Sequence, residues 1–289
     1  MNHDVLRIIG ERYHSMSKGQ RSIANYITNN YDKAAFMTAA RLGETAGVSE
    51  STVVRFACEL GYDGYPQLQR ALQTLARSRL TSVQRIELAG NRMDSSDVLE
   101  KVVGMDIDNL RHTFDEVSKV DFDRAAAAIA AANRLYVIGV RSSASLASFM
   151  AFYFNHIFDN VRSVNTTSVS EMFEQILNIG PGDVLIAITF PRYSQRTVKA
   201  AKYAHGCGAA VVSVTDSPAS PIVPYSDIPL FAKSDMASFV DSLVAPLSII
   251  NALIVAVGLR HEADLSETFK KLERVWDEYN VYQQEDERE

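Results

Sequence analysis

Residues 38–61 read TAARLGETAGVSESTVVRFACELG and predict two short helices joined by a tight turn. We expect the first helix over Thr38–Ala46 and the turn at Gly47 and Val48. Ser49 has the residue type of an N-cap for a second helix that runs to Leu60, and Gly61 then stands at the C′ position. Two short helices around a glycine turn are typical of a helix-turn-helix, a motif that places its second helix in the DNA major groove.

The second helix of this pair has one apolar face and one polar face. At 100° per residue, Val53, Phe56, Ala57 and Leu60 fall on one side, so we expect them to pack. The opposite side offers hydroxyls and one arginine, which can donate to phosphates and base edges. The candidate DNA-contacting residues are Ser49, Ser51, Thr52 and Arg55, with Lys18, Arg41 and Tyr62 as phosphate neighbours.

Each of these residues also has an ordinary structural interpretation. Ser49 can be only a helix cap, Arg55 only a solvated surface charge, and Tyr62 only a packing residue beneath a following helix at 66–76. The combination of helix, glycine turn and helix with a basic excess favours DNA binding. Residues 1–79 hold ten basic and seven acidic residues, so +3 lies there and −9 lies on the rest of a chain of net charge −6.

The amino-terminal part is predicted to be entirely helical. Ser17 and Gln20 form a capping box that starts a helix near Ser17, and the apolar residues at 5–9 predict a separate helix before it. We place a helical DNA-binding domain at residues 1–80, a polar linker at 81–96 and a second domain at 97–289.

Composition and targeting signals predict a cytoplasmic protein. The first ten residues include Asp4 and Arg7, so we expect no signal peptide. The two cysteines, Cys58 and Cys207, have no metal-ligand spacing, and we expect neither a metal nor a cofactor. The uncharged run 242–259 contains Pro246 and is interpreted as a buried helix, not a membrane span.

The second domain is predicted to be an α/β fold. Helices at 97–117 and 121–133 precede five strand-like runs, and these runs alternate with helices. Because most residues of these runs are apolar on both faces, they predict a three-layer, doubly wound parallel five-stranded sheet. The order 2-1-3-4-5 would make it flavodoxin-like, and helices at 238–259 and 265–282 close the domain. The five runs are Leu135–Gly139, Val161–Asn165, Val184–Phe190, Ala209–Thr215 and Ile228–Phe231.

Two polar loops follow the first and third strands, which flank the switch point of a 2-1-3-4-5 sheet, where ligands bind. Each loop opens a helix, and helix N-termini attract anions. The glycine patterns of dinucleotide and nucleoside triphosphate sites are absent, which favours a smaller anion. The serines can instead be ordinary caps, and the arginines ordinary surface charges. The candidate ligand-binding residues are Arg141, Ser142, Ser143, Arg192, Ser194 and Thr197.

With these motifs in hand, the chain resembles the RpiR family of bacterial transcription regulators over nearly its full length. Met37–Leu42, Gly47–Ser49, Thr52–Phe56 and Leu60–Tyr62 are similar to that family's DNA-binding signature. The resemblance implies a helix-turn-helix domain followed by a sugar isomerase (SIS) domain.

In such domains, hydroxyl-rich loops after the first and third strands hold a sugar phosphate, which implies contacts from Ser142, Ser143, Ser194 and Thr197. The chain departs from the pattern because Arg141 stands where a glycine is often found. Residues 189–197 also read TFPRYSQRT instead of a shorter serine-rich form.

Two functions remain open at this point. The favoured one is a homodimeric or homotetrameric regulator that binds an operator in double-stranded DNA and is controlled by a phosphosugar or related anion. The alternative is a phosphosugar isomerase with an accessory helical domain. An isomerase needs a positioned base, and the six histidines offer no convincing one.

Overall fold

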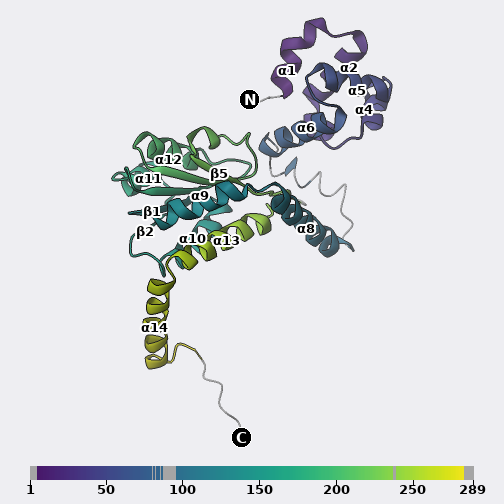
Figure 1. Cartoon of the computed structure of the whole chain (residues 1–289). Helices are drawn as coiled ribbons and strands as arrows, with labels where there is room; N and C mark the ends of the chain where they lie inside the picture. Colours follow the sequence, from purple (N-terminus) through teal and green to yellow (C-terminus); the bar gives the residue numbers. More distant parts are fainter. Residues whose placement is uncertain are drawn as a thin grey trace. The chain divides into compact units, whose positions relative to one another are not determined.

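A computed structural model of the 289-residue chain describes residues 5–79, 81, 83, 84, 86, 96–236 and 239–282. The chain divides into two compact units, Met1–Arg92 and Met93–Glu289 (Figure 1). The linker expected at 81–96 lies mostly outside the described residues, so its bounds stay a prediction.

The amino-terminal unit is helical, as predicted. The capping box at Ser17 is present: its hydroxyl accepts from the Gln20 amide and the Gln20 side chain accepts from the Ser17 amide. The core contains fully buried Ile23, Phe56 and Leu72. The helices are α1 Val5–Arg12, a 3-10 turn Tyr13–Ser15, α2 Lys18–Asn29, α3 Tyr31–Ala34, α4 Ala39–Ala46, α5 Glu50–Glu59 and α6 Tyr65–Arg79.

The helix-turn-helix forms as the sequence predicted. Thr38 caps α4, and Gly47 ends it with φ +70°, a left-handed conformation that glycine adopts without steric cost. The Ser49 hydroxyl accepts from the Thr52 amide at 3.3 Å and so starts α5. The chain therefore reverses over the three residues between the two helices.

The carboxyl-terminal unit is a parallel five-stranded sheet in the order β2-β1-β3-β4-β5, which confirms the predicted topology. Two helices precede the sheet, α8 Val98–Glu116 and α9 Lys119–Ala130. The strands are β1 Leu135–Gly139, β2 Val161–Val164, β3 Val184–Ile188, β4 Ala210–Thr215 and β5 Ile228–Phe231. Between them lie α10 Ser143–Phe154, α11 Val169–Ile176 and α12 Gln195–Gly206, with a 3-10 turn at Val223–Tyr225.

Alternation along the strands divides the core into two halves. Leu135 and Val137 of β1 pack with helices α9, α10 and α13 Val244–Arg260 on one face. Tyr136 and Ile138 point the other way and pack with α11 and α12. Both faces are therefore covered, as the fully buried strands β1 and β3 require, and this unit has three layers (Figure 1).

The last two helices begin at other positions than predicted. We expected a helix from Ser238, but α13 begins at Val244, and α14 spans Glu262–Glu278 instead of 265–282. A helix from Ser238 would place Pro246 in its interior, whereas a start at Val244 puts the proline in the first turn, where its missing N–H costs nothing. The side chains of Asp241 and Ser242 bond to other elements and hold residues 241–243 outside the helix.

Among the described helices, none is by itself long and apolar enough to cross a membrane. The pair α13 and α14, bent by 99° at its junction, meets the length and composition requirements only when both helices are counted together.

Candidate DNA-binding and ligand-binding sites

Helix α5 presents a packed face and an open face, as its periodicity predicted. Val53, Phe56 and Ala57 are at most 1% exposed, whereas Ser51 and Arg55 are exposed. The Arg55 Nε donates to the Ser51 carbonyl at 3.4 Å, a long contact that lays the side chain along the helix surface. The three candidate hydroxyls cluster at the amino end of α5, because the Ser49 Oγ lies 2.9 Å from the Ser51 Oγ and 2.8 Å from the Thr52 Oγ1.

The structure brings Lys18 close to this amino end. A side-chain carbon at the neighbouring Gly19 would lie 3.3 Å from Val48 and 3.8 Å from Thr52, so the first turn of α2 packs on the turn between α4 and α5. The Ser22 hydroxyl fixes this contact by donating to the Ala46 carbonyl at 2.6 Å. Lys18 itself is exposed, as a phosphate contact requires.

The other two proposed phosphate neighbours differ in their surroundings. Arg41 is exposed and pairs with Glu44 at 2.9 Å, one helical turn away, so a phosphate would have to compete with that carboxylate. Tyr62 packs against the helical core, and its hydroxyl oxygen is shielded from solvent. The packing alternative is therefore the better description of Tyr62, because a shielded hydroxyl offers nothing to a phosphate.

The loop after β1 is held tightly against the start of α10. A side-chain carbon at Gly139 would lie 2.2 Å from the Ser143 carbonyl oxygen, so only glycine fits at the end of this strand. Arg141 follows with φ +60°, the left-handed region. A positive φ favours glycine, which explains why a glycine is often found at this position. In this chain the position holds Arg141, whose side chain is exposed.

The two serines of this loop differ in accessibility. Ser142 is the N-cap residue of α10, but its side chain makes no capping bond and instead donates to Asp241 Oδ2 at 2.9 Å. Ser143 is 4% exposed at the first position of the helix. The positive end of α10 therefore already faces a carboxylate of the same chain, a contact that sequence reasoning missed.

The loop after β3 is polar and partly buried. Ser194 is the N-cap residue of α12 without a side-chain capping bond, and its amide donates to Thr189 Oγ1 at 3.3 Å. Arg192 is exposed. Thr197 is fully buried and its hydroxyl has no hydrogen-bond partner among the described residues. A ligand oxygen would reach Thr197 only after the atoms that bury it move.

Side-chain hydrogen bonds also hold the loop after β3 and the start of α12 in place. The Tyr193 hydroxyl donates to Asp216 Oδ1 at 2.8 Å, and burial beside that carboxylate raises the pKa of Tyr193 far above its ordinary value. Arg196 donates to the Thr166 carbonyl at 2.9 Å and so links α12 to the loop before α11. Glu171 in the first turn of α11 accepts from the Thr166 hydroxyl of the same loop.

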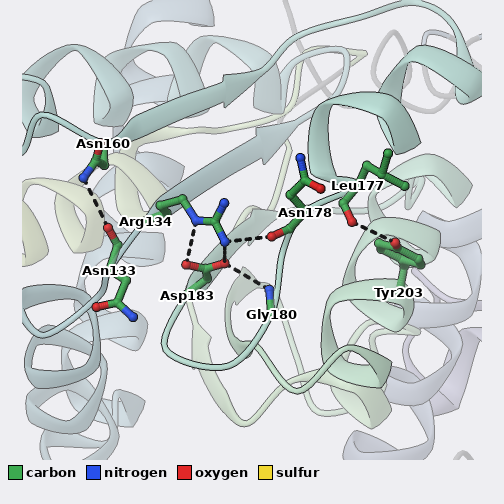
Figure 2. A network of polar contacts seen from close by, with 8 residues as sticks. All are labelled: Asn133, Arg134, Asn160, Leu177, Asn178, Gly180, Asp183 and Tyr203. Carbon is green, nitrogen blue, oxygen red and sulfur yellow. Dashed lines mark hydrogen bonds and ion pairs between the residues drawn. The ribbon is translucent and has the colours of Figure 1, made fainter.

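A second polar cluster lies at the opposite edge of the sheet (Figure 2). Asp183, which is 2% exposed, accepts from Arg134 Nε at 3.0 Å, from Arg134 Nη2 at 2.8 Å and from the Gly180 amide at 3.0 Å. The bond to Asp183 raises the pKa of Arg134. These residues stand where β1 and β3 begin, whereas ligands bind where strands end. We therefore interpret this cluster as structural.

The described residues contain no group of three or more histidine, cysteine, aspartate or glutamate side chains that could hold a metal ion. The candidate ligand site combines hydroxyls, arginines and two helix N-termini, which suit an oxyanion, with the Asp241 carboxylate that accepts from Ser142.

Comparison with known proteins matches both units. Residues 3–78 match the helix-turn-helix domain of the rpiR family, and residues 128–256 match the SIS domain. An uncharacterized HTH-type transcriptional regulator of Caldanaerobacter subterraneus subsp. tengcongensis is 26% identical, covering 91% of this chain and 93% of its own length. The HTH-type transcriptional regulator HexR of Pseudomonas aeruginosa is 25% identical, covering 93% of this chain and 94% of its own.

Solved structures share the fold. The sugar isomerase domain of an RpiR transcription factor from Sphaerobacter thermophilus matches with a TM-score of 0.58 and 23% identity, covering 62% of this chain and 99% of that one. Vibrio vulnificus NanR, solved in complex with ManNAc-6P, matches with a TM-score of 0.59 and 20% identity, covering 96% and 99%.

A helix-turn-helix unit followed by a doubly wound SIS domain defines a two-domain transcriptional regulator. The chain belongs to the RpiR family of these regulators, as its sequence motifs predicted.

Proposed function

We propose that this regulator binds an operator through α5 and that a phosphosugar or related anion in the SIS crevice controls its affinity for DNA. The observation that carries the proposal is the joint presence of an open hydroxyl-and-arginine face on α5 and two polar loops at the carboxyl edge of β1 and β3. We further propose a cytoplasmic location, because an operator-binding protein must reach the DNA. NanR, a relative in fold, was solved with ManNAc-6P, and this supports a phosphosugar as the class of effector.

Arg55 is proposed to contact a base, so its loss should reduce both affinity and specificity. We expect Arg55→Ala to weaken operator binding by about 1–3 kcal/mol and to relax the preference at one base position. The measurement is a DNA-binding titration with the operator and with a set of single-base variants. Operator binding as tight as that of the wild type would contradict the role of Arg55.

Lys18 is proposed to contact a phosphate, and its replacement provides the comparison for Arg55→Ala, because a phosphate contact does not distinguish one base sequence from another. Lys18→Ala should weaken binding to all sequences and lower the dependence of log affinity on log salt by about one unit. If both variants behave alike, the division between base and phosphate contacts is wrong.

The ligand site is proposed to hold the anion between the loops at 141–143 and 192–197. Replacing both Ser142 and Ser194 by alanine removes two donors, so we expect a loss of about 1–3 kcal/mol of binding free energy for each charge-assisted contact. A thermal-shift screen of phosphorylated sugars identifies a ligand, since ligands of the native state raise its stability. Calorimetry with that ligand then compares the variants.

Ser148→Ala is the control, because Ser148 is exposed on α10 beyond the proposed site. It should bind the ligand like the wild type. Full affinity in the Ser142→Ala, Ser194→Ala double variant would place the ligand elsewhere.

The isomerase alternative finds less support in the positions of the histidines. His205 faces Asp227 at 3.5 Å, ahead of β5, and His261 contacts the Ala130 carbonyl at 3.0 Å. His156 stacks on Phe269. None of these three contacts involves the loops after β1 or β3. Measurable isomerisation of any sugar in a panel of phosphosugars would favour the isomerase alternative.

We also propose that the protein is a homodimer or a larger homo-oligomer. On α13, Leu253 is fully buried while Val255 and Leu259 are 60% and 68% exposed, so the helix is apolar on a face that the described part of the chain leaves uncovered. These two residues border an apolar groove of about 350 Å³ that Tyr153 and Phe269 also line. A second copy would cover this surface, and a two-fold pair would read two half-sites. Sedimentation showing only monomer at micromolar concentration would contradict this.

A further inference from the structure

The connection between β5 and α13 is attached to α8 by a row of polar side chains. Asn109, 2% exposed, donates to the Asp235 carbonyl at 2.9 Å and accepts from the Asp235 amide at 3.2 Å. Thr113, 4% exposed, accepts from the Lys233 amide at 2.8 Å. Asp106 accepts from the Ser242 hydroxyl at 2.5 Å.

These three residues of α8 follow one another at spacings of three and four, so they share one face of the helix. Two of them are buried and bonded to backbone groups, and such bonds are costly to break. The connection and α8 should therefore move together. In the chain, α8 is the first helix after the linker from the DNA-binding unit.

The same connection reaches the candidate ligand site through Asp241. Its carboxylate accepts from the Ser142 hydroxyl at the N-cap of α10, at 2.9 Å, so it lies beside a helix end where an anion is favourable. An anionic ligand held by Ser142 would compete for that hydroxyl and would be repelled by the carboxylate. Ser242, the next residue, bonds to α8.

We propose that Asp241 is an internal competitor of the anionic effector, and that its displacement from Ser142 alters the attachment of the β5–α13 connection to α8. The proposal rests on the proposed function, because it needs the effector at the start of α10. In this proposal Asp241 lowers the affinity for the effector, and the effector acts through Asp241 and Ser242 on α8, the helix next to the linker.

Asp241→Asn tests the competition, because asparagine keeps an acceptor for Ser142 and removes the negative charge, with an amide NH2 in place of the second oxygen. The probe is inorganic phosphate, titrated at constant ionic strength against the full-length protein with thermal unfolding as the readout. We expect the half-saturating phosphate concentration to fall about tenfold, a modest effect for a removed like charge because the site is open to water. Asp108→Asn, an exposed change on α8 with the same effect on net charge, should leave it unchanged.

The link to α8 is measured by hydrogen exchange of residues 98–116 with and without phosphate. In the wild type, phosphate should change exchange in α8. Ser242→Ala should keep phosphate affinity within about twofold, since it touches no ligand, and should reduce that change.

Either of two results would overturn the proposal. One is a half-saturating phosphate concentration in Asp241→Asn that equals or exceeds that of the wild type. The other is hydrogen exchange in wild-type α8 that phosphate does not change. The Ser142→Ala, Ser194→Ala double variant separates this from failure of the proposed function. If the double variant loses the phosphate response and Asp241→Asn matches the wild type, only the competitor role is wrong. If the double variant responds fully, the ligand site itself is wrong.

Discussion

Phe56→Ala is expected to lower the free energy of unfolding of the helix-turn-helix unit by about 3–5 kcal/mol. Phe56 is 1% exposed and lies in the core of that unit with Ile23, Leu42 and Leu68. Alanine would remove the ring and leave a cavity that the surrounding helices fill only in part. For a unit of this size such a loss approaches the whole stability, so operator binding should disappear.

The carboxyl-terminal unit has its own cores and should be unaffected. Thermal unfolding of the variant should show an early transition from the damaged unit and a second one that phosphorylated ligands still shift. Val54→Ala is the control, because Val54 is 38% exposed on the same helix and should change stability by less than about 0.5 kcal/mol. A single transition at the wild-type temperature would contradict the packing role of Phe56, and loss of the ligand response would contradict the independence of the units.

Most of the fold could be predicted because its signals are local. The S-x-x-Q box at Ser17, the glycine at position 47 and the cap at Ser49 each lie within four residues of the backbone that they shape. The central strands β1 and β3 are apolar on both faces, and this indicates a parallel sheet between helical layers. The error at the start of α13 arose where Asp241 and Ser242 bond to distant elements.

The ligand site was less predictable, because contacts between distant residues define it. Ser142 and Asp241 are 99 positions apart, and no sequence pattern indicates that they meet. Burial also limits the access of solvent to two other candidate residues. Tyr62 and Thr197 carry hydroxyls suited to anion contacts, yet both hydroxyl oxygens are shielded from solvent. Periodicity indicates which face a residue occupies, but neighbouring loops decide whether its polar atom reaches solvent.

Gly139→Ala should have the second large effect, because the added carbon would meet backbone atoms that cannot turn away. It would lie 2.2 Å from the Ser143 carbonyl oxygen and 3.0 Å from the Ala147 side chain, so α10 would have to move off β1. We expect a loss of about 3 kcal/mol in the free energy of unfolding, at the upper end for overpacking. Effector binding should fall more than tenfold, because the donors of the loop move with the helix.

The same substitution at Gly104 serves as the control for Gly139→Ala. A side-chain carbon at Gly104, inside α8, has nothing within 4 Å, so Gly104→Ala should raise stability by about 0.5–1 kcal/mol through helix propensity alone. Chemical denaturation measures the free energy of unfolding, which should fall in Gly139→Ala and rise in Gly104→Ala. A thermal-shift titration measures the ligand affinity of both variants. If Gly139→Ala binds ligand like the wild type, the close contact between β1 and α10 does not set the geometry of the ligand loop, and the anion must be held by the loop after β3.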